Sequence, residues 1–112
     1  MELKKDLFFD GDSKWEDLGN GVSRQFVGYN TQLMMVAVKF EKEAIGPLHQ
    51  HFHSQITYVA KGKFEASVEG NIKILKEGDG FFPQPNIVHG VKCLEAGVLI
   101  DVFSPVREDF LK

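Results

Sequence analysis

Three of the four histidines in this 112-residue chain stand at alternate positions, His49, His51 and His53, and Gln55 continues the alternation. In a β-strand, alternate side chains project from the same face. Two imidazoles on one face, with an oxygen ligand nearby, can hold a divalent metal ion. The fourth histidine, His89, follows a separate segment rich in Gly and Pro. The pattern predicts a metal site assembled from two parts of the chain.

Alternating histidines also have ordinary explanations. A single histidine is most often a surface residue or a satisfied core residue, and an exposed His-rich loop produces the same spacing. Here the pair is bracketed by Gly46 and Gly62, and the second Gly/Pro-rich segment ends in His89. The combination favours a metal site over a chance arrangement.

Short apolar or alternating stretches broken by Gly and Pro dominate the chain, which predicts an all-β fold. The expected strands cover residues 22–28, 33–41, 47–52, 55–61, 63–69 and 72–76, and two more lie in 89–105 with a turn near 95–97. Pro83 and Pro85 confine the segment before the last two strands to a sheet edge or a loop. This succession predicts a sandwich, a barrel or a jelly roll with its core at about residues 22–104.

Two local structures can be assigned more closely. A three-residue loop over 69–71 would pair Val68 with Ile72 and keep apolar side chains on one face. The tail begins with Ser104-Pro105, a possible helix cap and first helical residue, with acidic residues in the next turn. We expect a short helical turn at the C-terminus.

Composition limits the classes of partner. With 13 basic and 16 acidic residues the net charge is −3, and no basic cluster suggests nucleic acid. The longest apolar run, residues 33–38, is too short to span a bilayer. The single cysteine, Cys93, is expected to pack in the core, and no signal peptide is visible. We expect one domain over residues 1–112, located in the cytoplasm, without a nucleic-acid or membrane partner.

The two Gly-rich segments resemble the motifs of a known family. The spacing of Gly46, the first two histidines, Gln55 and Gly62 resembles the first cupin motif, and GDGFFPQPNIVHG, residues 78–90, resembles the second. Gln55 stands where the first motif usually has Glu. Asn86 stands where the second has a glycine, and an asparagine can take the same turn geometry.

A longer resemblance covers residues 15–111, on SKWEDLGNGVSRQFVGYNTQLMMV, HFHSQITYVAKGKFE and GVLIDVFSPVREDFL. These stretches are similar to the KdgF family of pectin-degradation cupins. The resemblance implies a small single-domain β-barrel that opens the ring of 4,5-unsaturated uronates to linear 5-keto-4-deoxyuronate, and a homodimer. It also implies one divalent metal ion with four ligands, His49, His51, Gln55 and His89.

Asp101 is the candidate for proton transfer. It lies in the apolar stretch VLIDVFS, where alternation places it on the same face as Phe103. Burial raises the pKa of an aspartate unless a cation offsets it, so this carboxyl group suits one or both proton transfers of a ring opening. The alternative is a structural aspartate bonded to turn amides or to an arginine such as Arg24.

The resemblance also places Phe103 and Arg107 beside the substrate, with Arg107 among the catalytic candidates. His53 is a further substrate-binding candidate because it shares the alternation of the two histidines before it. Arg107 can bind a carboxylate bidentately, or form a surface salt bridge with Glu108 or Asp109. Phe103 can pack on a sugar face or simply belong to the core. His53 falls outside the metal spacing and either supports the metal ligands from behind, faces the substrate or is exposed.

Neutral ligands give the predicted metal site its chemistry. Three imidazoles and an amide leave the charge of a divalent ion uncancelled, which suits an anionic sugar substrate and a developing enolate. The ligand types fit Zn, Ni, Mn or Fe. An Fe(II) cupin dioxygenase, a non-catalytic sugar-binding cupin and a cupin that binds metal only for stability are the alternatives.

Overall fold

Eight strands of one sheet carry almost all the regular structure in the computed structural model, which describes residues 6–112. The strands are β1 (Glu16–Gly19), β2 (Val22–Tyr29), β3 (Met34–Phe40), β4 (Ile45–His49), β5 (Ser54–Val68), β6 (Asn71–Lys76), β7 (Gly80–Phe81) and β8 (His89–Ser104). One 3₁₀ turn, η1 (Glu108–Leu111), follows them. The all-β prediction is confirmed, and no helix of the described residues is long and apolar enough to cross a membrane.

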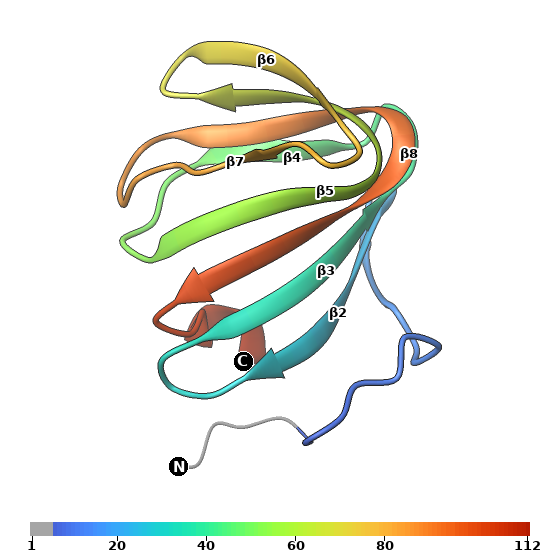
Figure 1. Cartoon of the computed structure of the whole chain (residues 1–112), viewed down its shortest axis with the longest axis vertical. Helices are drawn as coiled ribbons and strands as arrows, with labels where there is room; N and C mark the ends of the chain where they lie inside the picture. Colours follow the sequence, from blue (N-terminus) through green and yellow to red (C-terminus); the bar gives the residue numbers. More distant parts are fainter. Residues whose placement is uncertain (1–5) are drawn as a thin grey trace.

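The sheet closes on itself because its two longest strands bend. The strand order is β1-β2-β3-β8-β5-β6, with β4 also paired to β8 and β7 to β5, and every pairing is antiparallel. Figure 1 shows β5 and β8 curving together at one end of the molecule, so that the strands wrap around an interior. Each long strand therefore contributes to both halves of the barrel.

The predicted breaks inside β5 and β8 are wrong. The segments expected at 55–61 and 63–69 join in one strand that ends at Val68, and the two segments expected on either side of 95–97 also form one strand. The pairing register shifts three times between Val59 and Phe64, which marks bulges where the strands bend. The backbones of Gly62 and Gly97 are in close contact at this bend. A Cβ added to Gly62 would lie 2.6 Å from the Glu95 carbonyl oxygen. These glycines permit close packing of the two strands and do not form turns.

The expected register of the β5–β6 hairpin is also wrong. Val68 pairs with Asn71, so the loop has two residues, Glu69 and Gly70, with φ of 52° and 80°. Two central residues with positive φ are typical of the tight turn that matches the strand twist. Because the register follows this turn, Ile72 pairs with Ser67 and is 65% exposed.

Two element boundaries differ from the sequence prediction, and one short strand was not predicted. The strand expected at 47–52 is β4, which ends at His49. The helical turn forms, but it begins at Glu108, and Ser104 belongs to β8 and does not cap the turn. The short strand β1 was not predicted, because its four residues are all exposed and carry no apolar alternation.

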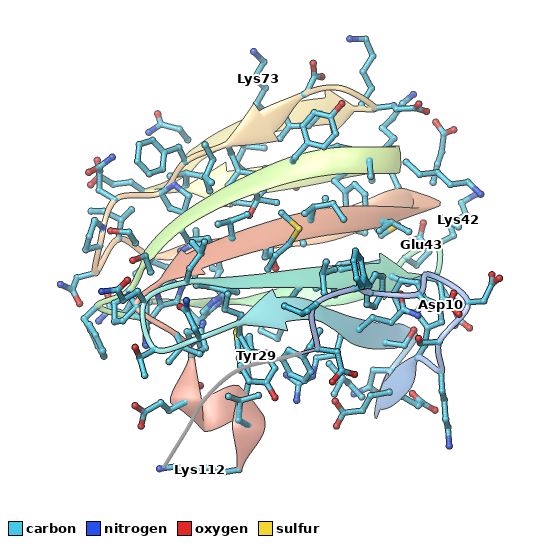
Figure 2. The ribbon with its side chains drawn as sticks, turned by 60° about the horizontal axis from the view of Figure 1, so that its bottom comes forward. Asp10, Tyr29, Lys42, Glu43, Lys73 and Lys112 are labelled. Carbon is cyan, nitrogen blue, oxygen red and sulfur yellow. The ribbon has the colours of Figure 1, made fainter. Side chains whose placement is uncertain are left out.

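Two apolar clusters fill the barrel. In one, the rings of Phe40 and Phe64 meet edge to face with centroids 5.3 Å apart, and the fully buried Cys93 packs in the same cluster, as predicted. The other cluster contains Met34, Val36, Phe103 and Val106. Charged side chains extend outward, such as Lys42 from the turn between β3 and β4 and Lys73 from β6 (Figure 2). Burial of apolar side chains therefore holds both halves of the barrel around the interior.

Candidate metal centre and substrate cavity

The four predicted metal ligands come together, although not from one strand. His49 ends β4 and pairs with His89, the first residue of β8. Gln55 is the second residue of β5, and His51 lies in the loop between β4 and β5. The ligand atoms of the three histidines all lie within 4.8 Å of one another. The histidines meet because two chain segments are paired, and simple strand alternation does not describe His51.

A backbone hydrogen bond connects the two motif segments beside the site. The amide of Asn86 donates to the carbonyl oxygen of His51 at 2.7 Å. Asn86 has φ of 66°, which is the left-handed conformation that glycine and asparagine adopt most readily. The asparagine therefore makes the turn in place of glycine, as predicted.

The backbone sets the same tautomer in all three histidines. The Nδ1 atoms of His49, His51 and His89 lie 2.8, 3.1 and 2.9 Å from the carbonyl oxygens of Pro47, His53 and Ile87. A carbonyl oxygen only accepts, so each Nδ1 carries the proton and donates it. Each neutral ring then keeps an unprotonated Nε2, the form that binds a metal.

Gln55 shows that these residues fit a cation. Its Oε1 lies 2.8 Å from Nε2 of His51 and 3.1 Å from Nε2 of His89. In the tautomer set by the backbone, neither Nε2 carries a proton. The lone pairs of these two nitrogens and of Oε1 therefore point toward one another with no proton between them. A divalent cation at this point would turn the repulsion into coordination by neutral ligands.

Burial keeps two of the ligand histidines neutral. It lowers the pKa of His89 and of His51, and hydrogen bonding to neighbouring groups only partly opposes the effect. A lower pKa favours the neutral imidazole that a metal requires.

Thr57 links the metal centre to Asp101. The Gln55 Nε2 donates to the Thr57 hydroxyl at 2.9 Å, and this hydroxyl donates to Asp101 Oδ1 at 2.6 Å. The first bond turns the amide oxygen of Gln55 toward the histidines. Thr57, and not a turn amide or Arg24, is the hydrogen-bond partner of Asp101 in the structure.

Asp101 has the environment of a proton-transfer group. Burial raises its pKa to about 6, against the hydrogen bond from Thr57 and the charges of His49 and Arg107. A carboxyl group that titrates near neutral pH can both accept and release a proton. Phe103 lies on the same inner face of β8, as predicted, and is buried.

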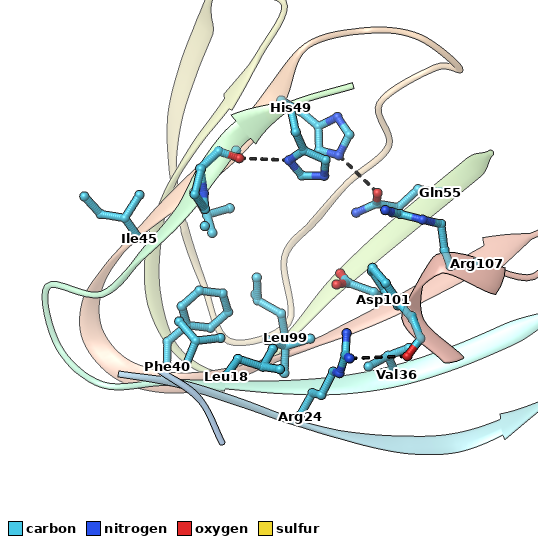
Figure 3. A pocket seen from close by; sticks show the side chains of 18 of the residues that line it. Leu18, Arg24, Val36, Phe40, Ile45, His49, Gln55, Leu99, Asp101 and Arg107 are labelled. Carbon is cyan, nitrogen blue, oxygen red and sulfur yellow. Dashed lines mark hydrogen bonds between the residues drawn. The ribbon is translucent and has the colours of Figure 1, made fainter. Parts of the chain in front are cut away.

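A cavity of about 360 Å³ joins these groups. Its wall includes His49, Gln55, His89, Asp101, Phe103 and Arg107 together with apolar side chains of β2, β3 and β8. Figure 3 shows His49 and Gln55 on one side of the cavity and Asp101 between them and Arg24. The volume lies near the lower end for ligand pockets, the range expected for a single sugar.

Arg107 forms the salt bridge considered for it and also lines the cavity. Its Nε and one terminal nitrogen donate to the two carboxylate oxygens of Asp109 at 3.1 and 2.9 Å. The salt bridge is therefore real, yet Arg107 is only 8% exposed and lines the cavity. Its guanidinium packs over the rings of Phe103 and Phe110, with centroid distances of 5.2 and 4.2 Å.

His53 is buried beside the cavity and is not among its lining residues. It is 8% exposed, stacks on Phe52 at 3.9 Å and has a buried Nδ1 without a hydrogen-bond partner among the described residues. Its ring centroid lies 5.4 Å from that of His51. The exposed alternative is therefore wrong, and His53 packs behind a metal-ligand candidate.

Sequence reasoning missed two residues of the site. Thr57 shares the inward face of β5 with Gln55, so strand alternation alone would have found it. Arg24 lines the cavity from β2, although it was considered only as a partner for Asp101. Alternation with Val22 and Phe26 was the available signal.

The comparisons agree with this geometry. The family model described as Cupin domain matches residues 36–103. The chain is 51% identical over 106 residues to the pectin degradation protein KdgF of Dickeya dadantii, covering 93% of this chain and 96% of that protein. The chain belongs to the KdgF family of cupins.

Two solved structures have the same fold, and one of them is a KdgF protein. An RmlC-like cupin from Shewanella frigidimarina superposes with a TM-score of 0.93 at 46% identity, covering 96% of this chain and 97% of that one. KdgF from a Halomonas species superposes with a TM-score of 0.90 at 39% identity, covering 95% and 99% of the two chains. The cupin fold implied by the motifs is thereby confirmed.

Proposed function

We propose that this chain is an isomerase-type enzyme that opens the ring of 4,5-unsaturated uronates to 5-keto-4-deoxyuronate in pectin or alginate breakdown. The observation that carries the proposal is the chain of hydrogen bonds from Gln55 through Thr57 to Asp101. It joins a neutral-ligand metal centre to a carboxyl group with a raised pKa inside one cavity. The relative in Dickeya dadantii, a pectin degradation protein, supports a role in pectin breakdown.

The charge of the site suits a uronate. His49, His51, Gln55 and His89 carry no negative charge in the form that would hold a metal, and Arg107 adds a positive charge to the wall. A divalent ion bound there would supply positive charge for a carboxylate and for a developing enolate oxygen. The cavity therefore favours a small anionic sugar over a neutral one.

The reaction needs two proton transfers and no oxidant. One proton leaves the anomeric hydroxyl as C1 becomes an aldehyde and its bond to the ring oxygen breaks. The ring oxygen is left as the oxygen of an enolate at C5. When C4 receives a proton, this enolate becomes the ketone at C5. Substrate and product have the same atoms, so an isomerase suffices.

Asp101 is the residue for these transfers. Its ionised carboxylate accepts the proton from the anomeric hydroxyl, and the same group can return a proton to C4. The hydroxyl of Thr57 holds Asp101 Oδ1, which leaves Oδ2 free for the substrate. Arg107 has N–H groups beyond the two that bond Asp109 and can donate to the sugar, while Phe103 supports the Arg107 guanidinium.

The remaining expectations are part of the proposal. We expect the enzyme to act in the cytoplasm on a free sugar, without nucleic-acid or membrane partners. Zn, Ni, Mn and Fe all suit three imidazoles and an amide, so metal availability would decide which ion is bound.

The decisive experiment follows the ultraviolet absorbance of the conjugated double bond in unsaturated galacturonate. Metal-reconstituted protein should remove it much faster than the spontaneous reaction, and chelator-treated protein should not. A His51→Ala, His89→Ala double variant is the matched control, since it should fail even after metal is added. A rate equal to the spontaneous one for metal-loaded wild type would rule out the proposal.

Two further measurements separate the alternatives. Oxygen consumption with the same sugar would indicate an Fe(II) dioxygenase. Calorimetric binding of the sugar without turnover would indicate a sugar-binding cupin. A rise in melting temperature on metal addition fits all of these functions, because any ligand that binds only the native state stabilises it.

A further inference from the structure

Arg24 is a second arginine in the cavity, and neither the metal centre nor the proton transfers use it. It lies on the inner face of β2, and its side chain is only 14% exposed. In Figure 3 it extends from β2 into the cavity, on the opposite side of Asp101 from His49. A cation at this place in a mainly apolar wall calls for an anionic or polar partner.

The strand register gives the position of Arg24. Arg24 pairs with Val38, which pairs with Leu99 on β8. Asp101 is two residues along β8 from Leu99, so Arg24 belongs to the adjacent row of inward side chains. Strands lie about 4.8 Å apart, and alternate residues along a strand about 7 Å apart. The arginine therefore lies two strands away from Asp101 on the same sheet, and it lines the cavity from β2.

Neighbouring groups hold the guanidinium in place. Its Nε donates to Glu16 at 2.9 Å and a terminal nitrogen donates to the Phe110 carbonyl oxygen at 3.4 Å. The planar group also packs over the rings of Phe26 and Phe110, with centroid distances of 5.0 and 4.8 Å. This arrangement restricts the side chain before any ligand arrives, which lowers the entropy cost of binding.

Arg24 still has donors to offer. A guanidinium has five N–H groups, and the two hydrogen bonds in the structure use two of them. Glu16 is 55% exposed, so water screens its charge and the pair leaves Arg24 available. A planar group with adjacent donors matches two neighbouring oxygens of a sugar.

We infer that Arg24 binds the O2 and O3 hydroxyls of the uronate, and this inference rests on the proposed function. With the carboxylate at the metal centre and the anomeric hydroxyl at Asp101, the vicinal diol is the polar part of the ring left unmatched. It faces the wall that carries Arg24. The unsaturated uronates of pectin and alginate are epimers at C2. A contact to the O2 hydroxyl lets Arg24 discriminate between them.

The test compares Arg24→Met with Glu16→Gln. Arg24→Met keeps the packing length on the two phenylalanines and removes every donor. We expect KM for unsaturated galacturonate to rise about tenfold, as for one charge-assisted hydrogen bond, with kcat changed less than about threefold. Arg24→Lys should lie between wild type and Arg24→Met. The ratio of kcat/KM for the two epimers should also change in Arg24→Met.

Glu16→Gln is the control for a purely structural role. It removes the charge that pairs with Arg24 but keeps an oxygen that can accept from the Arg24 Nε, so KM should rise far less than in Arg24→Met and the epimer ratio should stay near wild type. Equal KM values for Arg24→Met and wild type, an unchanged epimer ratio, or an equal rise in KM for Glu16→Gln would overturn the inference. A thermal melt of each variant confirms folding, and Arg24→Lys replaces Arg24→Met if the latter does not fold.

Binding measurements separate this inference from the proposed function. Saturated galacturonate keeps the carboxylate and both hydroxyls, and its affinity for the metal-loaded proteins can be measured by calorimetry. If wild type binds it without turning over the unsaturated sugar, the proposed reaction fails, and a weaker affinity in Arg24→Met alone still supports the arginine contact. If wild type neither binds nor reacts, both are overturned.

Discussion

At the residue scale, the site depends on which atom of each side chain already forms a hydrogen bond within the protein. The carbonyl oxygens that accept from Nδ1 of His49, His51 and His89 free the opposite nitrogens for a metal. Thr57 performs the corresponding task for Gln55, since it accepts from the amide nitrogen and leaves the oxygen toward the histidines. The neighbours of the ligands therefore select a metal-binding form before an ion is present.

Asp101→Asn should abolish most of the proposed activity. An amide cannot accept the anomeric proton, and general acid–base groups contribute about 10²–10⁴ in rate. Turnover in the ultraviolet assay should fall by at least about a hundredfold, while metal binding, measured by calorimetry, should stay near wild type. A variant that keeps full activity would remove Asp101 from the mechanism and leave the metal assignment standing.

Asp101 should also make the stability of the metal-free protein depend on pH. Its pKa is raised from 3.8 to about 6 in the folded protein, so the folded state holds a proton that the unfolded state has released. This contribution is fully present below the unfolded pKa and is lost as pH rises from about 4 to about 6. Denaturant unfolding at pH 4 and pH 7 should show Asp101→Asn gaining stability relative to wild type at the higher pH.

The control for that pH series is a carboxylate shifted the other way. The hydrogen bond from the Lys76 amide lowers the pKa of the exposed Asp79. The contribution of Asp79 is lost only below its unfolded pKa of 3.8, so Asp79→Asn should show nearly the same stability relative to wild type at pH 4 and pH 7, unlike Asp101→Asn. An Asp101→Asn protein whose relative stability is the same at both pH values would contradict a raised pKa.

At the element scale, the bend shared by β5 and β8 positions the site. β8 supplies His89 at its beginning and Asp101 near its end, and β5 supplies Gln55 and Thr57 between them. Because β8 is bent, its two halves pair with β4 and with β3, and both contribute to one cavity. Two straight hairpins would separate the histidine from the aspartate.

Gly62→Ala should disrupt this bend more than its backbone angle alone explains. Gly62 has φ of 87°, and an added Cβ would lie 2.6 Å from the Glu95 carbonyl oxygen. Gly70 has φ of 80° but no heavy atom within 4 Å of its added Cβ, so Gly70→Ala is the matched control. We expect Gly70→Ala to cost about 1–2 kcal/mol of unfolding free energy and Gly62→Ala clearly more, in denaturant unfolding. Equal losses would mean that the two strands can separate at the bend without cost.

At the scale of the whole molecule, the outer face of the barrel carries apolar side chains that the core does not use. Met35, Ile56 and Tyr58 are 38%, 52% and 52% exposed. Met35 and Ile56 both pair with Val102, so these side chains form one continuous row across β3, β8 and β5. We define Met35, Val102, Ile56 and Tyr58 as the outer patch. Contiguous apolar surface of this kind is typical of contacts between proteins.

We predict that the outer patch contacts a second copy of the chain, as the expected homodimer requires. Light scattering coupled to size exclusion should give about twice 12.6 kDa for the wild type. Ile56→Lys should give a monomer, while Ile72→Lys, at a 65% exposed position on β6, should remain a dimer. A monomeric wild type, or a dimer that survives Ile56→Lys, would rule out this interface.

The sequence by itself determined the chemistry of the site. The types and spacing of the histidines predicted a metal site built from two segments, the resemblance to the KdgF family supplied the set of four ligand candidates, and strand alternation placed Asp101 and Phe103 on one face. Such properties are local, because they depend on residues a few positions apart. The all-β fold follows for the same reason, since period-two alternation and turn residues are read within short segments.

Only the tertiary structure decided how these parts meet. Gly62 and Gly97 read as turns in the sequence, but their contact across two strands makes them points of close approach in a bend. Alternation gives the faces of Thr57 and Arg24, but their places beside Asp101 and in the cavity depend on the pairing of β5 with β8 and of β2 with β3. The packing of distant strands fixes these relations, and no short window of sequence contains both partners.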